Sequence, residues 1–256
     1  MDWSEFPKST FYHQEPIEPK RIKTMVKELP IGFTVEMVKA VREGRKTVTR
    51  RVIKIENPGF YRDATLLTDG AYRFNGYGTA DFKFLKPRYN VGDLLWVKES
   101  YCHGIEWDDC KPSEVDPLCG GNDIWYFADG ERPTEGWGKK RSSRFMPKWV
   151  ARTWLEVVSV RPERVQDITE EDAKLEGIRG YSAHGGGTHF NPVMIYPAFP
   201  EKGGGFSTAK EAFECLWDSI NAKRGYSWES NPFVWRIEFK ELKHLTQGRD
   251  EEAKTT

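Results

Sequence analysis

Residues 150–165, VARTWLEVVSVRPERV, form a long predicted strand that decides the fold class of this chain. The stretch is rich in β-branched and aromatic side chains, which favour extended backbone. Residues 167–178, DITEEDAKLEGI, follow it with the features of a short helix: Thr169 as N-cap, acids in the first turn and Gly177 at the end. We therefore expect a central strand that runs directly into a short helix.

The rest of the chain alternates between short strands and short helices. In residues 231–242, NPFVWRIEFKEL, the apolar side chains alternate and share one face of a strand; they are Phe233, Trp235, Ile237 and Phe239. Further strands are expected in 47–55 (TVTRRVIKI), 90–101 (NVGDLLWVKESY) and 123–130 (DIWYFADG). One helix should begin after Thr34 and end at Gly44, and another should run from Thr208, in a capping box with Glu211, to about Asn221. This order predicts an α+β fold, a small and mostly antiparallel β-barrel with flanking helices.

The predicted organisation is a single domain at residues 28–243. Residues 1–27 are polar without clear periodicity and are expected to form an N-terminal arm, and the polar residues 244–256 are expected to form a disordered tail. Two stretches have the composition of loop insertions. Residues 102–147 carry several turn signals, and residues 179–206 are rich in Gly and Pro.

Composition excludes several functional classes. Lys and Arg together number 39, as do Asp and Glu, so any affinity for a polyanion must come from local patches. No apolar run approaches the about 20 residues that span a bilayer, and the first residues lack a signal-peptide pattern, so we expect a cytoplasmic protein with no membrane contact. Cys102, Cys110 and Cys119 lack the closely spaced pairs of a zinc site, so we expect free thiols and neither metal nor cofactor.

Residues 43–51, EGRKTVTRR, concentrate positive charge just after a predicted helix. The four cations are Arg45, Lys46, Arg50 and Arg51. A helix C-terminus favours cations, but four mutually repelling charges predict acidic partners or a bound anion. The expected partners are Glu176, Glu99 or a phosphate of a ligand; a solvated strand is the alternative.

A second basic segment, residues 136–149, interleaves cations with aromatic rings. The cations are Lys139, Lys140, Arg141, Arg144 and Lys148, and the rings are those of Trp137, Phe145 and Trp149. A nucleic-acid groove uses both kinds of side chain, cations for phosphates and ring faces for bases. The alternative is an ordinary charged loop anchored by its aromatic residues.

Four separated segments resemble the ASCH domain of the PUA-like superfamily, and in particular its long phage and prophage branch. In chain order they are GRKTVTRR, VGDLLWV, LEVVSVRPERVQDITEEDAKLEGI and VWRIEFKEL, and the resemblance runs discontinuously over residues 31–242. It implies a small β-barrel with a cleft, in a host cytosol, and binding of RNA or nucleotides. A short bacterial branch of this family removes the acetyl group of acetylated cytidine with a Lys, a Thr and a Glu. The G-x-K-x-x-T element of that branch matches Gly44, Lys46 and Thr49 here, and its Glu matches Glu176.

The resemblance implies an amide hydrolysis. Thr49 would be the nucleophile, Lys46 its base once desolvation and neighbouring arginines lower the lysine pKa, and Glu176 would orient the lysine or protonate the leaving amine. Because Lys46 and Thr49 would point to opposite faces of a regular strand, Lys46 must still belong to the turn after Gly44. Alternatively, Lys46 and Glu176 form an ion pair that only attaches the helix to the barrel.

A base bound in the cleft needs a ring face and a polar edge. The candidates are Trp96, Tyr126 and Trp235 for stacking and Asn231 for the edge, although the barrel core is the favoured place for Trp235. Three functions stay open. The chain is a hydrolase of acylated nucleosides, or a non-catalytic reader of RNA or modified bases, or a phage accessory protein that acts through protein contacts; the oligomeric state is left open too.

Overall fold

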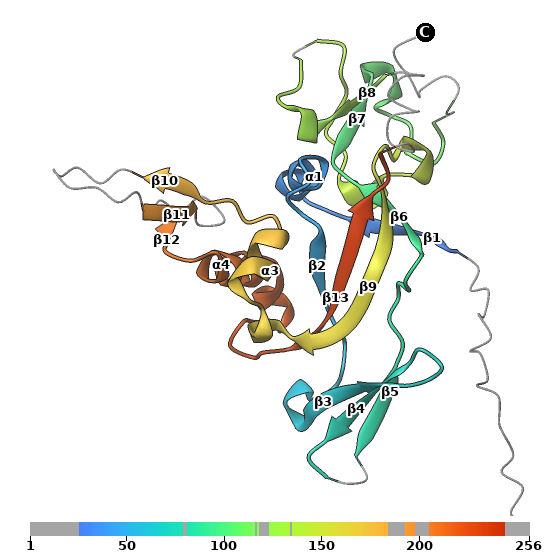
Figure 1. Ribbon diagram of the computed structural model, residues 1–256. Coiled ribbons are helices and arrows are strands. Elements are labelled where there is room, and N and C mark those ends of the chain that lie inside the picture. The colour runs from blue at the N-terminus through green and yellow to red at the C-terminus, as the bar shows by residue number, and fades with distance from the viewer. Residues whose placement is uncertain are drawn as a thin grey trace, which may run out of the picture.

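Strands β9 (Trp154–Arg164) and β13 (Phe233–Glu241) pair antiparallel at the centre of a five-stranded sheet (Figure 1). The computed structural model describes residues 26–78, 81–115, 117, 123–133, 135–183, 193–197 and 205–243. The strand order is β1-β6-β9-β13-β2, where β1 is Glu28–Gly32, β6 is Leu94–Lys98 and β2 is Val48–Val52. Only the β1–β6 pair in this sheet is parallel. The mixed α+β class and the mostly antiparallel pairing are as predicted.

The sheet is open, so the expected closed barrel is not formed by the described residues. Strands β1 and β2 lie at its two edges, and no backbone ladder joins them. The chain passes from one edge to the other through helix α1 (Val35–Arg42) instead of through paired strands. One side-chain bond crosses the gap: Arg51 Nη2 on β2 donates to the carbonyl of Gly32 on β1 at 2.7 Å.

Three smaller sheets surround this one. Strands β3 (Tyr61–Leu66), β4 (Tyr72–Gly76) and β5 (Phe82–Leu85) form an antiparallel sheet at the opposite end of the molecule from the β7–β8 pair (Figure 1). That pair is Tyr101–His103 with Ile124–Tyr126. Strands β10 (Tyr181–Ala183), β11 (Val193–Pro197) and β12 (Gly205–Phe206) form the third sheet. Strands β3, β4 and β5 are not predicted by any sequence pattern described above.

The helices begin at the predicted threonines. Thr34 caps α1, Thr169 caps α3 (Glu170–Leu175), and Thr208 caps α4 (Ala209–Asn221) in a capping box with Glu211. In each case the threonine hydroxyl accepts a backbone N–H of the first turn, which otherwise lacks a partner. The short 3₁₀ helices are Pro58–Phe60, Ile105–Trp107, Phe127–Asp129, Ser143–Phe145, Lys148–Val150, Val165–Asp167 and Ala222–Arg224.

Strand β13 separates two hydrophobic cores. Its alternate residues, Phe233, Trp235, Ile237 and Phe239, share a face in the main core, as predicted. Val234 points the other way, into a second core with Phe213 and Trp217 of α4. Helices α3 and α4 lie together on that side of β2 and β13 (Figure 1). The end of α3 is therefore held close to the start of β2, where Lys46 and Glu176 form an isolated backbone bridge.

The predicted insertions are only partly described. The described part of residues 102–147 includes β7 and β8 and adds Met146 to a small core with Tyr101, Val150 and Ala151. Residues 184–192 and 198–204 of the second insertion lie outside the described residues, as do residues 1–25 of the arm and the tail 244–256. No helix in the described ranges is both long and apolar enough to cross a membrane.

Candidate active site

Lys46 lies between helix α1 and strand β2, in the turn where the sequence places it. Gly44 adopts a φ of 73° after the helix, and the backbone N–H groups of Arg45 and Lys46 both donate to the Ala40 carbonyl. Lys46 then forms an isolated antiparallel bridge with Glu176, and β2 begins only at Val48. The turn, not the strand, therefore sets the direction of the Lys46 side chain.

The Lys46 ammonium is fully buried and has an acceptor for each of its three protons. Lys46 Nζ donates to Glu176 Oε2 at 2.6 Å, to the Glu176 carbonyl at 2.8 Å and to the Val48 carbonyl at 2.9 Å. Its side chain is 0% exposed and that of Glu176 is 4% exposed. Burial lowers the pKa of Lys46 from the ordinary lysine value, and the Glu176 carboxylate opposes that shift.

Gly177 makes this close approach possible. Its φ is 97°, and a Cβ atom there would lie 3.0 Å from the Ala40 Cβ and 3.3 Å from the Lys46 Cβ. Both the backbone angle and the space therefore favour glycine. The predicted helix-ending glycine thus also brings the Glu176 carbonyl within reach of Lys46.

Thr49 and Glu176 line the same pocket, which has a volume of about 220 Å³ and is called the Thr49 pocket below. Thr49 is buried, and its hydroxyl makes no hydrogen bond with any other residue that the structure describes. Apolar side chains of α1 and α4, among them Met37, Phe213 and Leu216, form one wall of the pocket. Lys46 itself does not line it, so the lysine meets the pocket only through Glu176.

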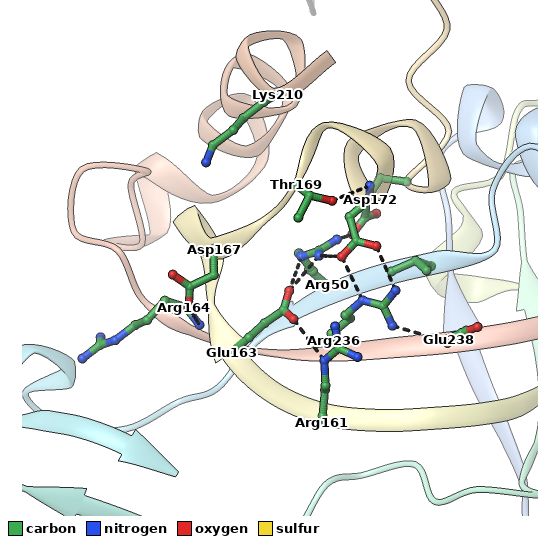
Figure 2. A network of polar contacts seen from close by, with 12 residues as sticks. Arg50, Arg161, Glu163, Arg164, Asp167, Thr169, Asp172, Lys210, Arg236 and Glu238 are labelled. Atoms are coloured by element: carbon green, nitrogen blue, oxygen red, sulfur yellow. Dashed lines mark hydrogen bonds and ion pairs between the residues drawn. The ribbon is translucent and has the colours of Figure 1, made fainter. Parts of the chain in front are cut away.

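Arg50 fixes the other oxygen of Glu176. Arg50 Nη1 lies 3.2 Å from Glu176 Oε1, while Nη2 pairs with Asp172 at 2.6 Å and with Glu163 at 2.7 Å. Asp172 also accepts two bonds from Arg236, at 2.9 and 3.0 Å. Figure 2 shows Asp172 between the two guanidinium groups, with Glu163 on the far side of Arg50. Charges of both signs alternate through this network, which holds the Glu176 carboxylate in one orientation.

Asp172 gives the network a measurable acid dependence. The hydrogen bonds from Arg236, and then those from Arg50, lower the pKa of Asp172 from 3.8 to about 2. The stabilisation is present above the unfolded-state pKa and is lost as the pH falls through about 2. Asp172→Asn should therefore lower the free energy of unfolding at pH 7 by about 1–2 kcal/mol, since each pKa unit corresponds to 1.36 kcal/mol and solvent screening reduces the total.

Thermal unfolding followed by circular dichroism between pH 7 and pH 2 measures this effect. The difference in stability between wild type and Asp172→Asn should shrink as the pH falls below about 4, because the Asp172 carboxyl of the unfolded wild type then takes up a proton before that of the folded protein does. Glu171→Gln is the matched control, an exposed acid on the same helix. A difference in stability that stays constant down to pH 2 would contradict the lowered pKa of Asp172.

The other two cations of residues 43–51 have different surroundings. Arg45 pairs with Glu43 at 2.6 Å and donates to the Gly177 carbonyl. Arg51 has no ion-pair partner among the described residues; it bonds the Gly32 carbonyl and lies 5.4 Å from the centre of the Phe33 ring. The four cations therefore do not share one pocket, although Arg50 and Arg51 both line the Thr49 pocket.

Glu99, a predicted partner of these cations, lies elsewhere. It is fully buried and accepts two bonds from Arg152, at 3.0 and 3.1 Å, and Arg152 also pairs with Asp129. Burial raises the pKa of Glu99, and Arg152 opposes that shift. Asp129 in turn pairs with Arg42 of α1 at 2.7 Å. This second network attaches β7–β8 and its surroundings to the sheet.

The predicted base-contacting residues are not brought together. Trp235 is part of the main core, and Tyr126 donates to the Val150 carbonyl with the Arg152 guanidinium 3.8 Å above its ring. Trp96 packs beside the small core of Tyr101. Asn231, at a φ of 42°, accepts a bond from the Gln166 N–H and so holds the loop before β13.

The basic segment 136–149 does not present its five cations on one surface. Arg141 is buried and donates to the Trp107 carbonyl, and Lys148 pairs with Glu28. The exposed Lys139 and Lys140 line a hollow that Asp108 and Asp109 line as well. Arg144 is exposed, and its carbonyl accepts a bond from Lys98.

Several site residues are missed by the sequence analysis. Glu163, Asp172 and Arg236 build the network around Arg50, and Lys54 and Arg224 line the Thr49 pocket. Acids in the first turn of α3 indicate only a favourable helix dipole, so nothing local marks Asp172 as a partner of two arginines. The alternation of β13 places Arg236 opposite its aromatic face, which is the one available signal.

No group of three or more potential ligand side chains among the described residues is arranged to hold a metal ion, and Cys119 lies outside those residues. No protein-family model, no curated protein and no solved structure matches the chain.

Proposed function

We propose that the protein is an ASCH-type, PUA-like amidohydrolase that removes an acyl group from the exocyclic amine of a cytidine-type base. The observation that carries the proposal is the shared lining of the Thr49 pocket. A buried threonine hydroxyl, which has no hydrogen-bond partner among the described residues, lines it together with a carboxylate that is ion-paired to a buried lysine. An uncommitted hydroxyl beside a buried acid–base pair is what nucleophilic catalysis requires. The volume of about 220 Å³ suits a small group such as a base.

In the proposed reaction, Thr49 Oγ attacks the carbonyl carbon of the amide. Its proton moves to the Lys46–Glu176 pair, in which the 2.6 Å bond allows one proton to be exchanged. The C–N bond then breaks, and the leaving amine takes a proton from Glu176, the member of the pair that lines the pocket. Water hydrolyses the acyl ester on Thr49, so that one amide and one water give one carboxylic acid and one amine.

The charges around the pocket support this course. A tetrahedral intermediate carries negative charge on the former carbonyl oxygen, and cations in a sheltered site stabilise it. Arg50, Arg51, Lys54 and Arg224 all line the Thr49 pocket. Arg50 already forms ion pairs with three carboxylates. The cations available to the substrate are therefore Arg51, Lys54 and Arg224.

Mass spectrometry of acylated nucleosides and nucleotides incubated with the protein tests the proposal. We expect loss of the acyl group from N4-acylcytidine derivatives and none from acylated adenosine or guanosine, because the pocket is small. If none of these acylated nucleosides and nucleotides reacts at any pH between 6 and 10, the protein is not the proposed hydrolase.

A second candidate function is non-catalytic reading of a modified base. What favours it is the full set of acceptors around the Lys46 ammonium, which stabilises the charged lysine as a purely structural ion pair. Under this function acylated bases bind and are released unchanged. Binding without turnover in the same panel separates the two functions.

A further inference from the structure

A hollow of about 680 Å³ lies at the open edge of the main sheet, beside the gap between β1 and β2. Its floor includes Gly32 of β1, Val52 of β2 and Trp235 of β13. The charged residues among its described lining are all cations: Arg51, Lys54, Lys86, Arg88 and Lys98. We call this feature the cationic hollow.

Most of these cations lack an acidic partner among the residues that the structure describes. Lys86 pairs with the exposed Asp69 at 3.1 Å, and no ion pair links the other four to any described residue. The cations of the site just described differ in this respect, because Lys46, Arg50 and Arg236 each contact a carboxylate. Five like charges around one hollow repel each other, and a bound anion relieves that repulsion.

Two of the cations are held in position by the fold. Arg51 is fixed by its bond to the Gly32 carbonyl. Arg88 stacks 5.5 Å from the centre of the Tyr89 ring, and the Tyr89 hydroxyl is anchored to the Pro30 carbonyl at 2.8 Å. Burial lowers the pKa of Arg51, and the nearby charges of Arg224 and Arg88 add to that effect. Guanidinium groups that line the same hollow suit a phosphate, because their N–H groups match the geometry of its oxygens.

The cationic hollow and the Thr49 pocket are neighbours, because they share three lining residues. Arg51, Val52 and Lys54 line both. A ligand can therefore place one group against Thr49 and another among the cations. The shared residues therefore place the two features side by side.

We propose that the cationic hollow binds a phosphate group of the same molecule whose base enters the Thr49 pocket. The inference rests on the proposed function, and it names the substrate class: an acylated cytidine nucleotide, or such a residue in a nucleic-acid strand, in preference to a free nucleoside. The hollow is larger than the Thr49 pocket, so it has room for a sugar and its phosphate outside the space that the base occupies.

The test compares N4-acetylcytidine with its 5′-monophosphate at low ionic strength. We expect kcat/KM to be about tenfold or more higher for the monophosphate, which corresponds to about 1.4 kcal/mol of added interaction with the cations. Arg88→Glu should abolish that preference, because the exposed Arg88 lines the cationic hollow and not the Thr49 pocket. Arg179→Glu is the matched control, an exposed arginine that lines neither feature, and it should keep the preference.

The outcomes separate the two proposals. Equal efficiency for both substrates, or a preference that survives Arg88→Glu, overturns the phosphate site and leaves the hydrolysis intact. If neither substrate reacts, calorimetric titration with cytidine 5′-monophosphate decides whether the cationic hollow binds a phosphate. Binding that Arg88→Glu abolishes and Arg179→Glu retains supports the phosphate site without the proposed chemistry, and absence of binding to the wild type overturns it.

A single strand and a mononucleotide differ in salt dependence. Each phosphate that a protein neutralises on a single strand adds about 0.7 to the slope of log affinity against log salt. A short oligonucleotide with one N4-acetylcytidine should therefore give a steeper slope than the mononucleotide if the strand is the substrate. Equal slopes assign the cationic hollow to the mononucleotide, because a single phosphate then makes all the contacts.

Discussion

Thr49→Val is expected to lower the rate of the proposed amide hydrolysis by about 10³-fold or more, because it removes the oxygen that we propose as the nucleophile. Valine has nearly the shape of threonine and is well accommodated in a strand, and Thr49 is a buried residue of β2 that pairs with Ile237 of β13. The hydroxyl makes no hydrogen bond with other described residues, so its removal leaves no described group unsatisfied. Activity is measured with the best substrate of the panel, and folding by thermal melting.

Two further variants make this result specific. Thr49→Ser keeps the hydroxyl and should retain measurable turnover, reduced because serine has more rotational freedom. Thr47→Val is the matched control: Thr47 lies two residues earlier, lines neither the Thr49 pocket nor the cationic hollow, and should be fully active. Wild-type activity in Thr49→Val would exclude a threonine nucleophile and leave the carboxylate to activate water directly.

Lys46→Arg, by contrast, does not separate catalysis from folding. Arginine keeps the positive charge and does not release a proton near neutral pH, so it would test a lysine base at an exposed position. Here the lysine side chain is fully buried, and a Cβ atom at residue 177 would lie only 3.3 Å from the Lys46 Cβ. A larger side chain at position 46 therefore disturbs packing whatever the chemistry.

Local sequence signals predicted the elements that carry the site, but not the contacts between distant segments. The capping threonines and the alternation in β13 are local, so α1, α3, α4 and the core strands follow directly from them. The odd spacing of Lys46 and Thr49 also required the turn that the structure has. In each of these cases the information lies within a few neighbouring residues.

The failed predictions involve pairing between segments far apart in the chain. Glu99 has the charge opposite to that of the arginines in residues 43–51, yet its partner is Arg152, which follows it by 53 residues. The cations of the cationic hollow come from residues 51–54, 86–88 and 98. No pattern within a few neighbouring residues of the sequence connects these three segments. A barrel closes only if the two edge strands of its sheet pair with each other. Here β1 and β2 do not pair, and the chain connects them through α1.

Glu176→Gln should lower the free energy of unfolding at neutral pH by about 3 kcal/mol, because it leaves the buried Lys46 ammonium without a countercharge. Lys46 should then lose its proton more readily, since burial already lowers its pKa and the opposing carboxylate is gone. A lysine whose folded-state pKa lies below the unfolded value binds fewer protons when folded, so stability rises with pH up to about 10.4. Glu176→Gln should therefore recover part of its loss between pH 7 and pH 10.

Urea unfolding across this pH range measures the effect, with the double variant Lys46→Met/Glu176→Gln as control. The double variant lacks the titrating lysine and has every other ionisable group of Glu176→Gln, so the difference between their pH profiles isolates Lys46. If the two profiles are parallel, Lys46 does not change protonation, and the proton exchange between Lys46 and Glu176 that the hydrolysis requires has no support. If they converge at alkaline pH, the buried Lys46 releases its proton once its countercharge is removed. The proposed proton exchange across the 2.6 Å contact between Lys46 Nζ and Glu176 Oε2 requires this behaviour.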